Sequence, residues 1–171
     1  LELSDARVDV MGYACLVAIM AQGKGYHKVA QERLRQRTVE NACPTPIVTS
    51  AGALVDGLHR MGARRIALVA PYMRPLTQMV VDYIEHEGVE VKDFVALEIA
   101  DNLEVGARDP MDLIEIYKRL DLRGVDALVL SACVQMPSLA AISLVEKAAG
   151  VPVRSAAVAT TYEMLSALGL E

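Results

Sequence analysis

The sequence contains no tryptophan and a single phenylalanine, so its hydrophobic core must be assembled from aliphatic side chains. Hydrophobic residues still make up 53% of the 171 residues, enough for one sizeable core or for two small lobes. This aliphatic and β-branched composition suits buried parallel strands covered by helices. No apolar run approaches the ~20 residues that a membrane span needs, and no signal-peptide pattern is present. We therefore expect no association with a membrane.

Clustered basic residues are also scarce. The net charge of −5 and the isoelectric point near 5.2 argue against a nucleic-acid partner, because phosphate binding requires grouped Lys and Arg side chains. The densest basic group is Arg33, Arg35 and Arg37, and Glu32 and Glu40 flank it. We interpret this group as a solvated helix face.

Cysteine is rare, and its number and spacing argue against a disulfide scaffold and a metal site. The three cysteines are an odd number without a C-x₂-C pair or a nearby histidine, which disfavours both a disulfide scaffold and a metal site. A reducing, cytoplasmic location is expected. Gly23 and Gly25 match too little of the dinucleotide-binding pattern to predict a nucleotide cofactor.

Strand and helix patterns alternate along the chain. We predict strands at residues 8–13, 47–49, 64–70, within 89–99, 125–133 and 151–154, and helices at about 26–37, 51–61, 76–88, 110–120, 138–149 and 156–168. Ser50 is the predicted cap of the second helix and Asp109 of the fourth, while residues 71–75 and 100–109 are predicted loops. This alternation predicts an α/β fold with a parallel sheet and right-handed crossovers.

Two stretches of the sequence repeat. Residues 8–15 and 125–133 share a Val-Asp pair, an apolar run and a closing Ala-Cys, and residues 46–51 resemble residues 152–157. The repeated unit is a strand, a cysteine, a helix, a proline, a second strand and a second helix. Duplication predicts a cleft with one thiol on each wall. Residues 66–120 have no counterpart ahead of Cys15, so we expect the amino-terminal lobe to be incomplete in this chain.

Cys15 and Cys133 are the candidate reactive residues. Both are predicted at strand-to-helix turns at the carboxyl ends of strands, where open α/β sheets bind their ligands. Backbone N–H groups at such turns can face the sulfur or hold a substrate carboxylate. His27, His59 and His86 fall on predicted helices as surface residues, so a Cys–His pair is disfavoured. What remains is a thiol pair, one acting as base or nucleophile and the other as acid.

The alternative for any cysteine is a buried structural role, since free cysteine is among the most buried residue types. We assign that role to Cys43, which lies outside the repeat. Tyr72 and Asn102 each follow a predicted strand and offer neutral donors for a carboxylate. Their alternatives are loop packing for Tyr72 and a capping or turn role for Asn102.

These motifs resemble the aspartate/glutamate racemase superfamily and, within it, the maleate cis–trans isomerases. The matching segments are Tyr13-Ala14-Cys15-Leu16-Val17, Ala70-Pro71-Tyr72, Asp101-Asn102 and Ser131-Ala132-Cys133-Val134-Gln135-Met136-Pro137. The amino-acid racemases typically carry Cys-Asn-Thr and Cys-Thr-His/Glu at the two sites, polar groups that this sequence lacks. Arylmalonate decarboxylases are similar but keep only the later cysteine, so Cys15 argues against that activity.

The resemblance implies two similar Rossmann/flavodoxin-like lobes related by pseudo-two-fold symmetry, with the active site in the cleft between them. We place residues 1–49 plus 153–171 in the amino-terminal lobe and residues 50–152 in the carboxy-terminal lobe. A leading segment with a further asparagine ligand is expected ahead of Leu1 in the family. A homodimer is also expected.

The resemblance also implies roles at the site. Cys15 is the expected thiolate that adds to maleate, and Cys133 is the expected thiol that protonates the adjacent carbon. The expected ligands of the small dicarboxylate substrate are the backbone around Leu16, Val17 and Val134, together with Tyr72 and Asn102. No cofactor is expected. The open alternatives are a racemase or decarboxylase of a small carboxylic acid, a non-catalytic carboxylate-binding module, and a redox dithiol pair.

Overall fold

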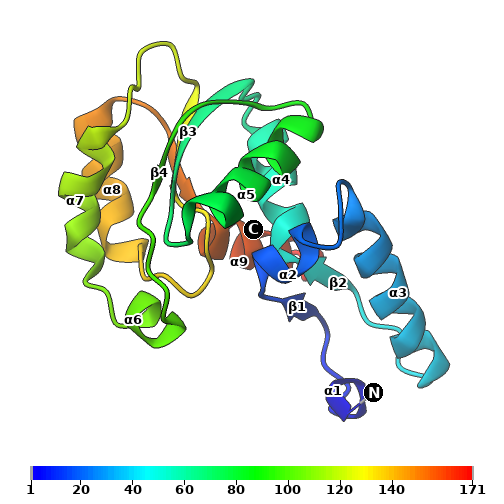
Figure 1. Cartoon of the computed structure of the whole chain (residues 1–171). Helices are drawn as coiled ribbons and strands as arrows, with labels where there is room; N and C mark the ends of the chain where they lie inside the picture. Colours follow the sequence, from blue (N-terminus) through cyan, green and yellow to red (C-terminus); the bar gives the residue numbers. More distant parts are fainter. Residues whose placement is uncertain (1, 171) are drawn as a thin grey trace.

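The computed structural model describes residues 2–170, an α/β chain with two parallel sheets in that range (Figure 1). The strands are β1 (Met11–Tyr13), β2 (Ile47–Thr49), β3 (Arg65–Ala70), β4 (Glu90–Ala96), β5 (Ala127–Ser131) and β6 (Val153–Ser155). The α-helices are α1 (Glu2–Asp5), α2 (Leu16–Met20), α3 (Tyr26–Glu40), α4 (Ser50–Arg60), α5 (Arg74–His86), α6 (Asn102–Gly106), α7 (Leu113–Ile116), α8 (Leu139–Ala149) and α9 (Ala156–Ala167). The predicted fold class is confirmed. No helix within residues 2–170 is long and apolar enough to cross a membrane.

The larger sheet has the strand order β4-β3-β5-β6, and every neighbouring pair is parallel. Counted from β3, this order is 2-1-3-4, which is how a flavodoxin-like sheet begins. Its topological switch point lies between β3 and β5, which pair from Ile66 opposite Ala127. Ligands of such sheets bind outside the carboxyl ends of the strands at the switch point. A site is therefore expected at the segments that come after Ala70 and Ser131.

The continuous aliphatic run of β3 supplies two cores at once, because alternate residues of a strand face opposite sides of the sheet. Ile66 and Leu68 face a first core together with side chains of α2, α4 and α5. Ala67 and Val69 face a second core with side chains of α7 and α8. These helices lie on the two sides of the larger sheet (Figure 1). The sheet is thus held between two apolar layers.

The smaller sheet repeats the local structure of β5 and β6. Tyr13 of β1 lies opposite Thr49 of β2, as Ser131 of β5 lies opposite Ser155 of β6. Thr49 and Ser155 each cap the following helix, because each side-chain oxygen accepts the backbone N–H three residues later. The two repeated stretches of the sequence therefore have the same strand pairing and the same capping hydrogen bond.

The predicted boundary between the lobes is wrong at residues 153–155. Strand β6 pairs with β5 in the larger sheet, so it does not belong to the amino-terminal part. Helix α9, which comes next in the chain, does cross to the smaller sheet, where the Met164 side chain packs on Gly12. A Cβ atom at Gly12 would lie 2.7 Å from the Met164 sulfur, so glycine permits this close approach.

Two predicted helix starts are shifted. Thr49, not Ser50, is the cap of α4, since Thr49 accepts the backbone N–H of Gly52 at 3.2 Å. Helix α5 begins at Arg74 with Pro75 in its first turn, earlier than predicted. Proline is tolerated there because the first N–H groups of a helix have no partner within the helix.

Two predictions for the segment between β4 and β5 are also wrong in part. The predicted loop at residues 100–109 contains α6, which starts because the Asp101 carboxylate accepts the backbone N–H of Leu103 at 2.8 Å. The predicted helix at residues 110–120 is broken into α7 flanked by two short 3₁₀ turns. Its predicted cap is confirmed, since Asp109 accepts the N–H of Met111.

The basic group on α3 is solvated, as predicted, but it is not confined to one face of the helix. Arg33, Arg35 and Arg37 are all exposed, and Arg35 lies on a different side of the helix from the other two. Arg35 and Arg37 pair with Glu32 and Glu40 three residues away. Exposed pairs of this kind contribute little to the free energy of unfolding. Their role is solvation of the helix.

His27 is not the surface residue that its helical position suggests. It is buried, and its backbone N–H donates to the Tyr83 hydroxyl at 3.0 Å, which leaves that hydroxyl to donate to His27 Nδ1 at 2.6 Å. Burial is the main cause that lowers the pKa of His27. The neutral ring thus joins α3 to α5, whereas His86 is exposed at the end of α5.

The two neighbouring hydroxyls at the start of α4 should respond oppositely to removal. Thr49→Ala should lower the free energy of unfolding by about 1 kcal/mol, because a capped N–H loses its acceptor. Ser50→Ala should leave it unchanged or raise it slightly, because the buried Ser50 Oγ has no hydrogen-bond partner. Urea unfolding checks both; a larger loss in Ser50→Ala would contradict the assignment of the cap.

His27 should make the fold sensitive to mild acid. Because its pKa is lowered in the folded state, the unfolded chain binds the proton more readily below the ordinary imidazole pKa of about 6.5. Stability present above that pH should be lost as the pH falls toward the folded-state pKa. His27→Gln should lose less stability than the wild type between about pH 7 and pH 5. The control His86→Gln should match the wild type, and an equally steep loss in His27→Gln would refute the effect.

Candidate active site

Cys133 lies just beyond β5, at the switch point of the larger sheet. The Ala132 N–H donates to the Val69 carbonyl at 2.9 Å, which continues the pairing with β3 up to the cysteine. The Ser131 hydroxyl donates to the Cys133 carbonyl at 2.8 Å and fixes the adjoining turn. Cys133 is 6% exposed and packs in the second core. Its position is therefore set by backbone and core contacts alike.

Cys15 is exposed and lies at the N-cap of α2, with an extended backbone. Helix α2 is anchored because Leu16, Ile19 and Met20 are buried in the first core, against the larger sheet. The N–H groups of Leu16 and Val17 belong to the first turn, where a helix offers them no internal acceptor. Cys15 thus follows a strand of the smaller sheet, and α2 holds it against the larger sheet.

The two cysteines differ in the structure on their carboxyl side. A helix starts directly after Cys15, as predicted, but α8 starts only at Leu139, so Cys133 leads into a turn. The backbone of Val134 is accordingly not at a helix N-terminus. The Val134 side chain is half-buried and packs on the first core.

Tyr72 lies beside the strand end that carries Cys133. It lies just beyond β3, touches both cores, and its hydroxyl donates to the Ala132 carbonyl at 3.2 Å. Burial raises the pKa of Tyr72, and the neighbouring Cys133 and then Cys15 raise it further. The hydroxyl therefore stays a neutral donor. Tyr72 and Cys133 are neighbours at the switch point, and α2 docks Cys15 against the same sheet.

Asn102 is the first residue of α6 and is exposed. It is not the helix cap, a role that Asp101 takes. The Asn102 carbonyl accepts a hydrogen bond from Gln135 Nε2 at 2.7 Å, which fixes Asn102 beside the Cys133 turn. Asn102 therefore lies next to the loop that carries one of the cysteines.

Three supporting residues were not predicted from the sequence. Ser131 fixes the Cys133 turn, Gln135 holds α6, and the Thr77 hydroxyl donates to the Tyr72 carbonyl at 3.1 Å. Ser131 and Gln135 lie inside the motif around Cys133, which was the one available signal. The Ser131 bond is local to the turn, whereas the Gln135 bond to another loop depends on tertiary structure that no local pattern contains.

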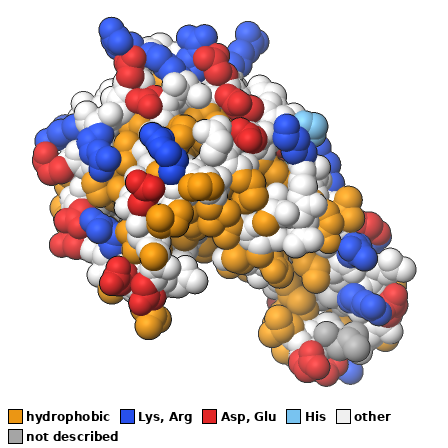
Figure 2. Space-filling model, in the orientation of Figure 1, with side chains coloured by type: hydrophobic (Ala, Val, Ile, Leu, Met, Phe, Trp, Pro, Cys, Tyr) orange, Lys and Arg blue, Asp and Glu red, His pale blue; other side chains and the backbone are white. Residues whose placement is uncertain are grey.

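The face drawn in Figure 2 has hydrophobic side chains gathered over its middle and charged side chains around its upper rim. Its lower edge is hollowed between the projection that carries α6 and the one that carries α1 and α3 (Figures 1 and 2). Within residues 2–170, no three His, Cys, Asp or Glu side chains lie together as metal ligands would. The polar side chains of the site are two thiols, a phenol and an amide.

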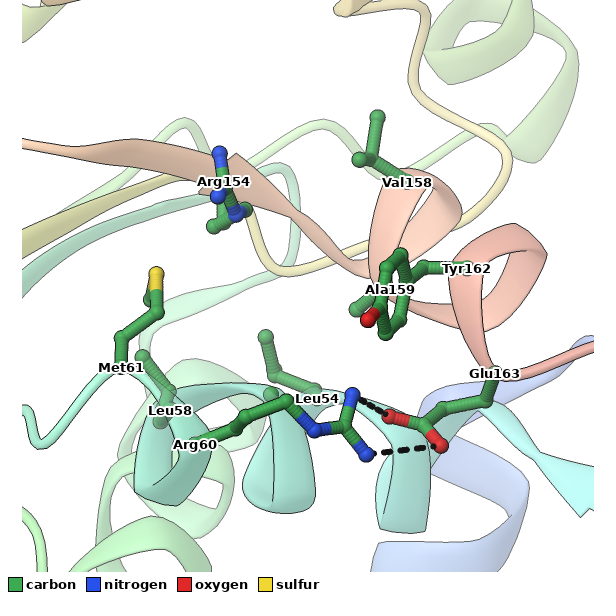
Figure 3. A pocket seen from close by; sticks show the side chains of 10 residues that line it. Leu54, Leu58, Arg60, Met61, Arg154, Val158, Ala159, Tyr162 and Glu163 are labelled. Atoms are coloured by element: carbon green, nitrogen blue, oxygen red, sulfur yellow. Dashed lines mark hydrogen bonds and ion pairs between the residues drawn. The ribbon is translucent and has the colours of Figure 1, made fainter. Parts of the chain in front are cut away.

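A separate cavity of about 400 Å³ lies between α4 and α9 (Figure 3). Its walls are mostly apolar, and Arg60 and Glu163 form a two-pronged ion pair at its edge, with N–O distances of 2.6 and 3.2 Å. None of the predicted site residues lines it. It is therefore not part of the cysteine site.

A flavodoxin-like sheet with one thiol at its switch point, and a second thiol docked against it by α2, defines a racemase-type α/β protein. A family model described as arylmalonate decarboxylase matches residues 7–171. The chain belongs to this family.

Curated relatives within the family are more specific. A maleate isomerase from Pseudomonas putida is 61% identical over 170 residues, which cover 99% of this chain and 68% of the relative. A maleate isomerase from Geobacillus stearothermophilus is 57% identical over 171 residues, covering 100% of this chain and 68% of the relative. The resemblance seen in the motifs is confirmed.

Solved structures agree. A cysteine-to-alanine variant of the maleate isomerase Iso from Pseudomonas putida, crystallised with maleate, superposes with a TM-score of 0.97 at 63% identity, covering 99% of this chain and 68% of that one. A cysteine-to-serine variant of the Nocardia farcinica enzyme, with a covalently bound succinylcysteine intermediate, gives 0.96 at 45% identity, covering 99% and 69%. Arylmalonate decarboxylase itself gives 0.84 at 20% identity, covering 98% and 72%, and shares the fold.

The unequal exposure of the cysteines predicts an order of alkylation. Iodoacetamide should modify the exposed Cys15 first, the half-buried Cys43 next and the buried Cys133 last, because the reagent must reach the sulfur. Peptide mass spectrometry of samples quenched at intervals gives the order. In urea the three rates should converge, and early modification of native Cys133 would contradict its placement.

Proposed function

We propose that this protein catalyses the cofactor-independent cis–trans isomerisation of maleate to fumarate. The observation that carries the proposal is the position of Cys133 at the switch point beside Tyr72, whose hydroxyl donates to the Ala132 carbonyl, while α2 docks Cys15 against the same sheet. Two thiols held against the same sheet supply the nucleophile and the proton donor that addition across a double bond requires. Relatives named maleate isomerase, with 57–61% identity, support the choice of substrate.

The first step is addition. The Cys15 thiolate attacks one alkene carbon of maleate, forming a C–S bond while the π electrons move to the adjacent carbon. That carbon takes the proton of the Cys133 thiol, which becomes a thiolate. Exposed Cys15 is accessible to an incoming alkene, whereas buried Cys133 is held rigidly beside Tyr72, as suits a proton donor.

Rotation and elimination complete the reaction. The former double bond is now single, so its carbons can rotate until the carboxylates are trans. The Cys133 thiolate then removes a proton from the carbon next to the one bonded to sulfur. The electrons of that C–H bond re-form the double bond, and the C–S bond breaks to release Cys15 as thiolate. Both cysteines return to their starting states, and no external electron or proton is consumed.

Neutral donors hold the two carboxylates. The N–H groups of Leu16 and Val17 at the start of α2, and the backbone at Val134, adjoin the two cysteines. The Tyr72 hydroxyl donates to a carboxylate in place of the Ala132 carbonyl, and the Asn102 side-chain amide donates to a carboxylate as well. Uncharged donors allow one carboxylate to move during rotation without breaking an ion pair.

We also propose the expected assembly, together with a division of the chain that differs from the expected one at β6. The smaller sheet with α9 forms one lobe, and the larger sheet with α4 forms the other, with the cysteine site between them. The repeated strand pairs and caps support a pseudo-two-fold relation. A homodimer and a cytoplasmic location, where free cysteines persist, complete the proposal.

Removing either thiol should abolish turnover. Cys15→Ala and Cys133→Ala in the full-length protein should each reduce fumarate formation by at least about three orders of magnitude, as expected when a covalent or proton-transfer step is lost. Proton NMR follows maleate and fumarate directly. Cys43→Ala, which removes the third cysteine outside the site, should keep wild-type turnover.

Near-normal activity in either active-site variant would refute the mechanism. The racemase alternative is tested by incubating small amino acids in deuterated water, where a racemase would label the α-carbon. Absence of such label, together with fumarate production from maleate, distinguishes the two activities.

A further inference from the structure

One side chain connects the two loops that carry Asn102 and Cys133. Gln135 lies two residues after Cys133, and its Nε2 donates to the Asn102 carbonyl at 2.7 Å across a sequence separation of 33 residues. It binds the main chain of Asn102, so the Asn102 amide remains available to a ligand. A mobile connection here would let the two loops shift independently.

Helix α6 needs such a tether. It has five residues, far fewer than an isolated helix requires to be stable in water. Leu103 is 79% exposed, and Val105 is the buried residue of the helix. The contacts of Val105 alone would allow α6 to pivot, because one anchor point does not fix an orientation.

Gln135 supplies the second point of contact. A Cβ atom built on Gly106 would lie 3.4 Å from Gln135 Nε2 and 3.7 Å from its Cγ, so the side chain runs beside the end of α6 as well as its start. These are ordinary van der Waals distances, so Gln135 lies alongside Gly106. Gln135 therefore adjoins both the first and the last residue of α6.

We propose that Gln135 is a positioning residue that holds Asn102 at a fixed distance from Cys133, and thereby sets the binding of one substrate carboxylate. The inference rests on the proposed function. It assigns no chemistry to Gln135, whose N–H is engaged by a carbonyl. Binding groups must be held within roughly 0.5 Å of their working geometry, which a five-residue helix with one apolar anchor does not provide.

The test uses steady-state kinetics of the full-length protein with maleate. Gln135→Met keeps length and bulk but removes the donor, and Gln135→Glu places a carboxylate against the Asn102 carbonyl. Losing one hydrogen bond that acts on binding should raise KM for maleate roughly threefold to tenfold with kcat within about twofold. Gln135→Glu should raise KM further. The matched control Gln78→Met removes an exposed bond to Asp82 on α5 and should leave both constants unchanged.

A double-mutant cycle separates positioning from general stability. If Gln135 acts through Asn102, then Asn102→Ala with Gln135→Met should have the same KM as Asn102→Ala alone. Because Gln135 is exposed, the melting temperatures of the variants should stay close to wild type. An unchanged KM in Gln135→Met, or an effect that adds fully in the Asn102→Ala background, would overturn the inference. A wild-type protein that forms no fumarate would instead overturn the proposed function, and this inference with it.

Discussion

The parallel pairing of β3 with β5 is the constraint on which the site depends. It brings the end of β3, with Tyr72, to the end of β5, with Cys133, although Tyr72 and its partner Ala132 are 60 positions apart in the sequence. The hydroxyl of Tyr72 then bonds the carbonyl just before the cysteine. Cys15 joins this pair because α2 buries its apolar side chains against the same sheet. A change in the β3–β5 register would move the Tyr72 phenol and the two thiols apart.

The fold was predictable where sequence patterns are local and repeated. The aliphatic run of β3, the short β2 and the spacing of α9 all follow from periodicity and flanking turns. The paired Ala-Cys segments identified both candidate reactive residues, and Tyr72 was chosen for its place after a strand. The prediction was wrong where two adjacent residues were equally suitable for one role. Thr49 and Ser50 are both good caps by composition, and only the backbone geometry at the end of β2 decides that Thr49 accepts the N–H.

The other wrong or missing predictions concern residues whose position depends on tertiary contacts. Nothing in the sequence around His27 indicates that its ring reaches Tyr83, 56 residues away, and becomes buried. The pairing of β6 with β5 likewise depends on the larger sheet having a free edge there. The role of Gln135 was hidden for the same reason, since its partner Asn102 lies on another loop. Local patterns thus located the candidate reactive atoms, whereas the groups that hold them in place required the folded structure.

The crossing of α9 from one sheet to the other has a consequence for folding. Helix α9 leaves the larger sheet to cover the smaller one, and α2 and α4 leave the smaller sheet to complete the core of the larger one. The first core of the larger sheet therefore depends on α2 and α4, which adjoin the smaller sheet, whereas the second core is built within residues 67–153. The first core and the smaller sheet should form together in one cooperative step.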